Sequence, residues 1–259
     1  MLTSVLVSLL FGALIGFSLG TVGGGGSILT VPILVYAIGQ PVQSATTTSL
    51  AIVGLSALIG MVGHLSAKRV DVKTGLIFGL VGIGGAFLGS WLNTLVPGKS
   101  LLIGFAFVMI FAAAAMLRRR TSPLDLIDKI QDRSSVREWV KIGLSGTFVG
   151  LMTGFFGVGG GFVIVPALVL VLGLSMRVAV GTSLLIIAIN SGFSLMAHLR
   201  FGGLDIWLVA LFILGGIPGA LGGARLAGRI PQQRLSQAFA AMITMVAVYV
   251  LTRSFMGSA

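Results

Sequence analysis

Long, unbroken apolar runs constrain this chain more than any other feature. Most are about 20 residues long, enough for a helix to cross the hydrocarbon core of a bilayer. Only 9% of the residues are charged, against about 25% in a soluble domain, so the chain cannot cover a water-facing surface. A membrane β-barrel would instead show alternating segments of about ten residues. We therefore predict an all-α integral membrane protein. Its apolar segments are expected near residues 2–22, 27–39, 42–66, 72–95, 99–117, 142–157, 161–173, 177–200, 204–226 and 231–252.

The charged residues lie mainly between these runs. Seventeen Lys and Arg residues oppose six Asp and Glu residues, for a formal net charge of +11. In a membrane protein such basic residues orient the chain and do not indicate a nucleic-acid partner. The polar stretch 118–141 is expected to be a solvated connector between two transmembrane regions, 1–117 and 142–259. The absence of cysteine excludes disulfides, thiolate metal sites and thiol nucleophiles. The first segment has neither a basic start nor a small-residue cleavage site, so it is expected to be a retained helix.

The two regions are copies of one another at a fixed offset of 134 residues, without a gap. The offset aligns glycines, prolines and histidines, residue types that rarely coincide by chance. Aligned pairs, called mates below, include Gly20 and Gly154, Pro32 and Pro166, Thr48 and Thr182, Ser49 and Ser183, His64 and His198, and Asp71 and Asp205.

The two copies are expected to be inverted relative to each other. In each copy two apolar segments joined by a glycine run return the chain to its starting side, and three crossings follow. The expected fold is therefore about eight full spans plus two Gly-broken hairpins or short helices. Inversion places fourteen basic residues on one face and three on the other, whereas a parallel arrangement gives twelve and five. The preference of basic residues for the cytoplasmic side favours inversion, with the 118–141 connector in the cytoplasm and both termini outside.

The glycine runs are the strongest candidates for a binding site. Consecutive glycines break a helix, and in hydrocarbon the freed amides must be buried or line a wet cavity. A helix that resumes after such a break presents uncapped amides and a positive dipole end, which favour an anion. Paired broken helices in inverted halves are typical of the midplane site of a secondary transporter. The expected substrate-binding residues in these runs are Gly24, Gly25, Gly26, Ser27, Gly159, Gly160 and Gly161.

Glycines also permit close packing between membrane helices. Gly12, Gly16 and Gly20, and likewise Gly85 and Gly89, recur at helical spacing and are expected to serve this purpose. Packing alone is the alternative interpretation of the consecutive runs.

A polar stripe lies on the segment after each hairpin. Ser49, Ser56 and His64 share one helix face, and the second copy repeats the pattern with Ser183, Asn190 and His198. Neutral polar side chains on an apolar helix are expected to face the bundle interior. Their donors suit an oxyanion, and bonding between helices or to the preceding turn is the alternative. The expected binding residues on these segments are Thr48, Ser49, Thr182, Ser183 and Asn190.

His64 and His198 each lie near the end of a segment, about 15 Å by helical rise from its centre. In an inverted arrangement they would lie near opposite membrane faces, too far apart to share a metal ion. A gating or proton-coupling role and an interfacial, hydrogen-bonded role both stay open. Asp71 and Asp205 begin the next segments, where a carboxylate caps a helix N-terminus or pairs with a nearby base.

Several functional classes lack their residues in this sequence. No Asp, Glu or Lys lies deep in a span, which argues against a carboxylate proton relay or a ring of acids for cations. There is no P-loop, no H-E-x-x-H motif and no pair of buried carboxylates, so neither an enzyme nor a metal or other cofactor is expected. A neutral, donor-rich path in a strongly basic protein indicates anions.

The doubled motif resembles the sulfite exporter TauE/SafE family, also called the TSUP family. The resemblance covers essentially the whole chain and rests on the glycine-rich elements that end at Pro32 and Pro166, each followed by a Thr-Ser pair. The first copy departs from the second in having Ser27 where Gly161 stands. The resemblance implies an inner-membrane transporter of sulfur-containing anions such as sulfite, sulfoacetate or related sulfonates.

We therefore expect a secondary transporter, an exporter of small sulfur-containing oxyanions, in which rocking of the two copies alternates access. Its expected partners are a small anionic substrate and the lipid bilayer, and an assembly of identical chains is compatible with the sequence. A passive anion channel, a membrane-embedded enzyme and a non-transporting membrane subunit are the alternatives.

Overall fold

The computed structural model describes residues 2–93, 95–96, 98–118, 136–156, 161–198 and 203–256. Helices account for the regular secondary structure of these residues, and none of them lies in a strand. The first copy comprises α1 (Leu2–Val22), α2 (Gly25–Pro32), the π-helix η1 (Ile33–Ala37), α3 (Val42–Ser66), α4 (Val72–Asn93) and α5 (Gly98–Arg118). The second copy comprises α6 (Val136–Phe156), α7 (Gly161–Leu170), α8 (Met176–His198), α9 (Ile206–Arg229) and α10 (Gln232–Met256).

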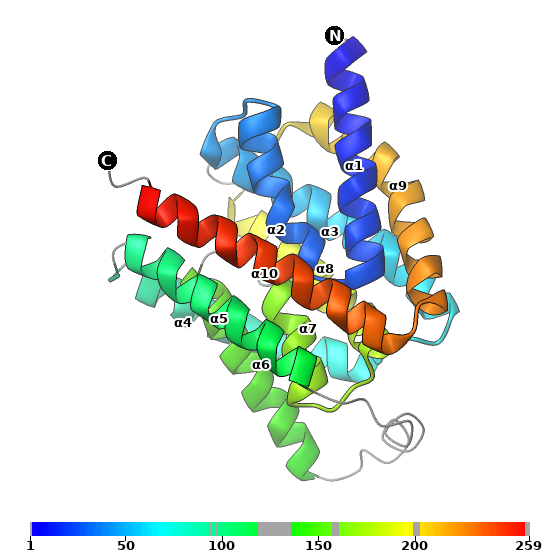
Figure 1. Ribbon diagram of the computed structural model, residues 1–259, viewed down its shortest axis with the longest axis vertical. Coiled ribbons are helices and arrows are strands. Elements are labelled where there is room, and N and C mark those ends of the chain that lie inside the picture. Colours follow the sequence, from blue (N-terminus) through cyan, green and yellow to red (C-terminus); the bar gives the residue numbers. More distant parts are fainter. Residues whose placement is uncertain are drawn as a thin grey trace.

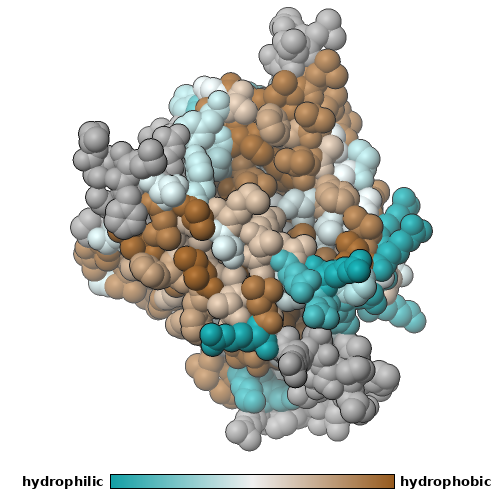
Figure 2. Space-filling view, viewed as in Figure 1, coloured by the Kyte–Doolittle hydropathy of each residue, from teal (hydrophilic) through white to brown (hydrophobic). Residues whose placement is uncertain are grey.

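The helices have the lengths and surfaces of a membrane protein. Within the described residues seven helices are long and apolar enough to cross a bilayer, namely α1, α3, α4, α6, α8, α9 and α10. Three further apolar stretches span Gly25–Ala37, Ile103–Arg118 and Gly161–Leu170, and the second of them is the larger part of the 21-residue helix α5, which was expected to be a full span. Hydrophobic residues cover most of the described surface in Figure 2, and exposed side chains include Leu10, Phe87, Phe111, Leu144, Ile206 and Met245. Such a surface is stable against lipid rather than water, which confirms an all-α integral membrane protein.

Helix α6 extends into the segment that the sequence predicts to be the connector between the copies. Helix α6 begins at Val136, six residues before the expected start at residue 142. Glu138, expected in the connector, lies in the first turn of α6, where its carboxylate suits the positive end of the helix dipole. Residues 119–135 of the connector lie outside the described residues.

The closest helix pairs each join one copy to the other. Helix α1 runs parallel to α9, and α6 runs parallel to α4; Figure 1 shows α1 beside α9. Glycines on α1, α4 and α6 contact the backbone of the partner helix, which confirms the expected packing role of Gly12, Gly16, Gly20, Gly85 and Gly89. The α1 contacts are Gly12 with Phe212, Gly16 with Gly216 and Gly20 with Ala220, and the α6 contacts are Gly146 with Phe78, Gly150 with Gly82 and Gly154 with Ala86. The two sets are mates, so the copies pack by the same contacts.

Helices α3 and α8 pack against each other as the most buried pair of spans. They run antiparallel, because Gly54 of α3 lies against Ser191 and Gly60 against Leu184. Helix α2 folds back along α1, since a Cβ at Gly26 would lie 2.8 Å from the carbonyl oxygen of Ile15. The remaining mates, α5 and α10, lie side by side across one face (Figure 1). The orientation of the copies relative to a membrane stays a prediction.

Candidate transport site

The first glycine run interrupts the chain between α1 and α2. Helix α1 ends at Val22, and Gly23 adopts φ +78°, a left-handed conformation that glycine adopts without strain. Helix α2 then begins with Gly24 as its N-cap residue, which has no side chain to bond the exposed amides. The Ser27 hydroxyl donates to the Gly24 carbonyl oxygen over 2.6 Å and so leaves the amides of the first turn uncapped.

The second glycine run meets the first. Helix α6 ends at Phe156 and α7 begins at Gly161, whereas Gly159 and Gly160 lie outside the described residues. Gly161 packs directly on Gly24, where a Cβ would overlap the partner's backbone. A Cβ at Gly161 would in turn lie 2.7 Å from the Ser27 hydroxyl. The N-terminal ends of α2 and α7 therefore touch, and the contact has no room for a methyl group.

Two residues that sequence reasoning missed also lie at this junction. The terminal methyl of Met242, on α10, fills the space beside Gly25, with its sulfur 2.8 Å from where a Cβ of Gly25 would lie. The Ser18 hydroxyl of α1 donates to the same sulfur over 3.6 Å. Ser18 precedes the glycine run by about one helical turn, which was an available signal. Nothing in the sequence linked Met242 to the run, because that contact is formed only by tertiary packing.

Thr48 and Thr182 join the two copies. Both are fully buried. The Thr182 hydroxyl oxygen accepts from the Asp71 amide over 2.9 Å, and that of Thr48 accepts from the Asp205 amide over 3.4 Å. Thr48 also donates to the Gly203 carbonyl oxygen over 3.4 Å. These hydroxyls thus make the interhelical bonds that were the alternative to substrate binding.

Asp71 and Asp205 cap helix N-termini, which is one of the two roles expected for them; the other was pairing with a nearby basic residue. The Asp71 carboxylate accepts from the amide of Thr74 over 3.0 Å and from its hydroxyl over 2.7 Å. The Asp205 carboxylate accepts from the Leu208 amide over 3.0 Å. Each carboxylate thereby satisfies amides at the start of α4 or α9.

Ser49 and Ser183 bond within their own helices. Their hydroxyls donate to the carbonyl oxygens three residues earlier, over 2.7 Å to Thr46 and 2.8 Å to Val180. Ser183 also lies beside the break in α1, because a Cβ at Gly23 would be 2.6 Å from its hydroxyl oxygen. The structure thus brings Ser183 to the glycine junction.

Two mates on the polar stripes carry unpaired polar atoms. Ser56 Oγ on α3 and Asn190 Oδ1 on α8 are buried and have no hydrogen-bond partner among the described residues. The Ser56 hydroxyl faces α9, 3.3 Å from the position of a Cβ on Gly216. An unpaired polar atom in a membrane interior is costly, and these two lie at equivalent positions in the two copies.

His64 is fully buried and bonds to the end of α1. Its Nε2 lies 2.8 Å from the carbonyl oxygen of Gly20, in the last turn before the glycine break. That carbonyl is among those left without an intrahelical partner where a helix ends. His198 is the last residue of α8, and its side chain lies outside the described part of the structure.

Comparison with known proteins agrees with the motif. A family model described as sulfite exporter TauE/SafE matches residues 8–250. A probable membrane transporter protein of Xylella fastidiosa strain 9a5c is 37% identical over 97% of this chain and 97% of its own length. The probable membrane transporter protein YunE of Bacillus subtilis is 29% identical over 91% of this chain and 93% of its own length. No solved structure matches the chain.

Proposed function

Since the chain belongs to the sulfite exporter TauE/SafE family, we propose that it is a secondary transporter that moves small sulfur-containing oxyanions, such as sulfite or organosulfonates, out of the cell. That it is a multi-pass membrane protein of a transporter family is the premise. The substrate, the direction and the inner-membrane location are the proposal. The family description supports a sulfur oxyanion, and the basic composition supports an anion.

The observation that carries the proposal is the contact between the N-terminal ends of α2 and α7 at Gly24 and Gly161. Each helix start carries a partial positive charge, so two starts in contact repel. An anion between them would offset this repulsion and accept hydrogen bonds from the uncapped amides. Backbone amides supply these donors without a buried fixed charge, which is costly in hydrocarbon.

Binding requires this junction to open, because Gly24 and Gly161 are in direct contact. Movement of one hairpin away from the other would separate them and expose the first turn of α2. Met242, a flexible side chain beside Gly25, would then move aside for the anion. Ser183, at the break in α1, would add a hydroxyl to the opened site.

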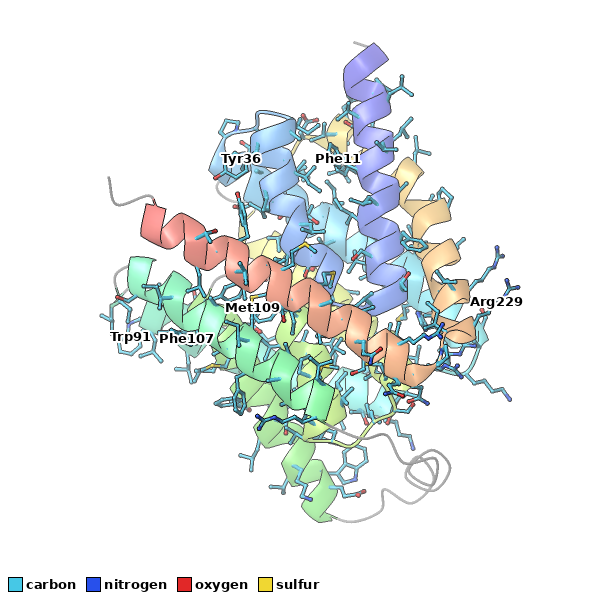
Figure 3. The ribbon with its side chains drawn as sticks, viewed as in Figure 1. Phe11, Tyr36, Trp91, Phe107, Met109 and Arg229 are labelled. Atoms are coloured by element: carbon cyan, nitrogen blue, oxygen red, sulfur yellow. The ribbon has the colours of Figure 1, made fainter. Side chains whose placement is uncertain are left out.

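An inverted arrangement of the copies is part of the proposal, since it lets one movement exchange the accessible side. The antiparallel run of α3 and α8 and the return of α2 along α1 support it. The distribution of basic residues supports a cytoplasmic location for the end of α9, which carries Arg229. A teal, hydrophilic region gathers on that side in Figure 2, and Arg229 and Tyr36 lie far apart in Figure 3.

A thermal-shift screen on the detergent-solubilised protein tests the substrate class. We expect sulfite, thiosulfate or a sulfonate such as methanesulfonate to raise the melting temperature more than sulfate or chloride, because a ligand that binds the native state stabilises it. Equal shifts with all of these salts would contradict a specific sulfur oxyanion site.

Uptake into proteoliposomes tests the site. Ser27→Leu and Gly160→Leu should abolish transport but leave membrane insertion intact, whereas Gly222→Ala, which points into open space on α9, should transport normally. Unimpaired uptake by both leucine variants would refute the placement of the site. Saturable counterflow identifies a carrier, whereas single-channel currents would identify the passive channel.

A further inference from the structure

The hydrogen bond of His64 fixes the tautomer of its neutral ring. A carbonyl oxygen only accepts, so the 2.8 Å contact with Gly20 requires the hydrogen on Nε2. In the neutral ring Nδ1 then carries a bare lone pair. The ring is fully buried, and Nδ1 has no hydrogen-bond partner among the described residues.

An unpaired nitrogen at this depth is costly unless it is used. Nδ1 is the one atom of the ring free to take up a proton. A proton there would turn the Nε2–H bond to Gly20 into a charge-assisted bond, which is stronger than a neutral one. Protonation of Nδ1 would thus tighten the link between α3 and the end of α1.

Protonation of Nδ1 depends on the charged groups around His64. Arg69, which follows α3, is the charged side chain among the described residues whose field acts on the ring, and its backbone amide bonds to the His64 carbonyl oxygen over 3.0 Å. Helix α1 has no charged residue, α8 contributes Arg177 one turn before Gly181, which packs against the Cβ of His64, and α9 contributes exposed Arg225 and Arg229. At the start of α4, the Asp71 amide bonds to Thr182, the residue after Gly181, and the Asp71 carboxylate accepts from Thr74. The Asp71 carboxylate is engaged in the cap of α4, and α1, α8 and α9 offer an imidazolium only positively charged residues until an anion arrives.

We infer that His64 is the proton-binding residue of this transporter, and that one proton moves with each monovalent anion. The inference rests on the proposed function. The proton binds the lone pair of Nδ1 when the anion binds, comes from water on one side of the membrane, and returns to water on the other. Because binding couplings are reciprocal, the anion favours the proton as much as the proton favours the anion.

The location of His64 explains why the two events would be coupled. Gly20 is four residues before Gly24, so the histidine is bonded to the helix end that leads into the anion site. An imidazolium adds positive charge near the starts of α2 and α7. The bound anion in turn offsets the burial cost of that charge.

Proteoliposomes with radiolabelled methanesulfonate separate coupling from transport. This anion is monovalent and does not titrate near neutral pH, and the membrane voltage is held at zero with potassium and valinomycin. One assay measures counterflow at equal pH, and the other measures accumulation with the outside about one pH unit more acidic. His64→Gln keeps an amide N–H for the Gly20 carbonyl but cannot take up the proton. Ser66→Ala is the matched control, because that exposed hydroxyl bonds to Val62 in its own helix.

For the wild type and Ser66→Ala we expect counterflow and about tenfold accumulation, since one pH unit is a tenfold proton gradient. For His64→Gln we expect counterflow without accumulation. Accumulation by His64→Gln, or counterflow without accumulation by the wild type, would overturn the inference and leave the proposed function standing. A wild type without counterflow would overturn the organosulfonate proposal, and this inference with it. The melting temperature shows whether the His64→Gln variant folds. If it folds but lacks counterflow, then His64 is needed for transport itself, and the inference that it serves only to couple the proton is overturned.

Discussion

The hydroxyl of Thr182 accepts a hydrogen bond from the backbone amide of Asp71 over 2.9 Å, which ties α8 of one copy to the start of α4 in the other. Thr182→Val removes the acceptor and leaves that amide without its partner, a loss of about 1–3 kcal/mol. We expect a lower melting temperature in detergent, whereas Thr182→Ser should retain the wild-type value. Thr48→Val should cost less, because its bond to Asp205 is longer, 3.4 Å. A wild-type melting temperature for Thr182→Val would show that the bond contributes nothing to stability.

Two glycines on α9 should respond oppositely to the same substitution. A Cβ at Gly219 would overlap the Ala13 carbonyl of α1, whereas a Cβ at Gly222 meets nothing within 4 Å. Gly219→Ala should therefore push α1 and α9 apart and lower the melting temperature. Gly222→Ala should raise stability by about 0.5–1 kcal/mol, because alanine loses less backbone entropy in a helix. Equal effects of both variants on thermal unfolding would contradict the close contact.

Neighbouring glycines at the junction of α2 and α7 provide a second matched pair. A methyl group at Gly24 meets the backbone of Gly161, which cannot yield without separating the helices. One at Gly25 meets only the end of the Met242 side chain, which can rotate away. Gly24→Ala should thus lower the melting temperature in detergent, and Gly25→Ala should keep most of the wild-type value. The reverse order would place the critical contact on the α10 side of the junction.

Substitution of Ser56 can distinguish an effect on stability from an effect on anion binding. Its buried hydroxyl has no hydrogen-bond partner among the described residues, so Ser56→Ala should leave the free energy of unfolding unchanged or increase it. If the hydroxyl donates a hydrogen bond to the bound anion, its loss weakens the free energy of binding by about 1.5–3 kcal/mol. This corresponds to a loss of affinity of about tenfold or more. Binding of methanesulfonate and thermal unfolding, measured on the same preparation, decide between these effects. Unchanged affinity would remove Ser56 from the path.

The orientation can be tested by cysteine labelling, because the chain contains no cysteine of its own. Tyr36 and Arg229 are both exposed and lie far apart in Figure 3. In intact cells a membrane-impermeant maleimide should label Tyr36→Cys and should label Arg229→Cys only after permeabilisation. Labelling of Arg229→Cys in intact cells would reverse the proposed orientation, as would a C-terminal reporter found in the cytoplasm.

Helix positions were predictable because glycine, proline and charged residues interrupt the apolar runs. The expected segments 2–22 and 42–66 coincide with α1 and α3. The start of α6 was not predictable, because Glu138 and Lys141 gave its first turns the composition of a solvated connector. A charged first turn outside the hydrocarbon does not show in hydropathy.

The candidate site was only partly predictable. The glycine runs indicated a broken helix, and the break at Gly23 is present. The partners of Thr48 and Thr182 could not be inferred, because each lies in the other copy and hydroxyls carry no sequence signal of their acceptor or donor. The contact of Met242 with Gly25 could not be predicted either, because a methionine in an apolar helix has the same sequence pattern as any other core residue.

The contact between α1 and α9 has a consequence for biosynthesis. When the ribosome has completed the first copy, α1 has already entered the bilayer, but the helix that covers its glycines has not been made. Those glycines must face lipid or a chaperone until α9 is inserted. The first copy on its own therefore cannot reach its final packing, and a nascent chain halted in the 119–135 region should be a substrate for membrane quality control.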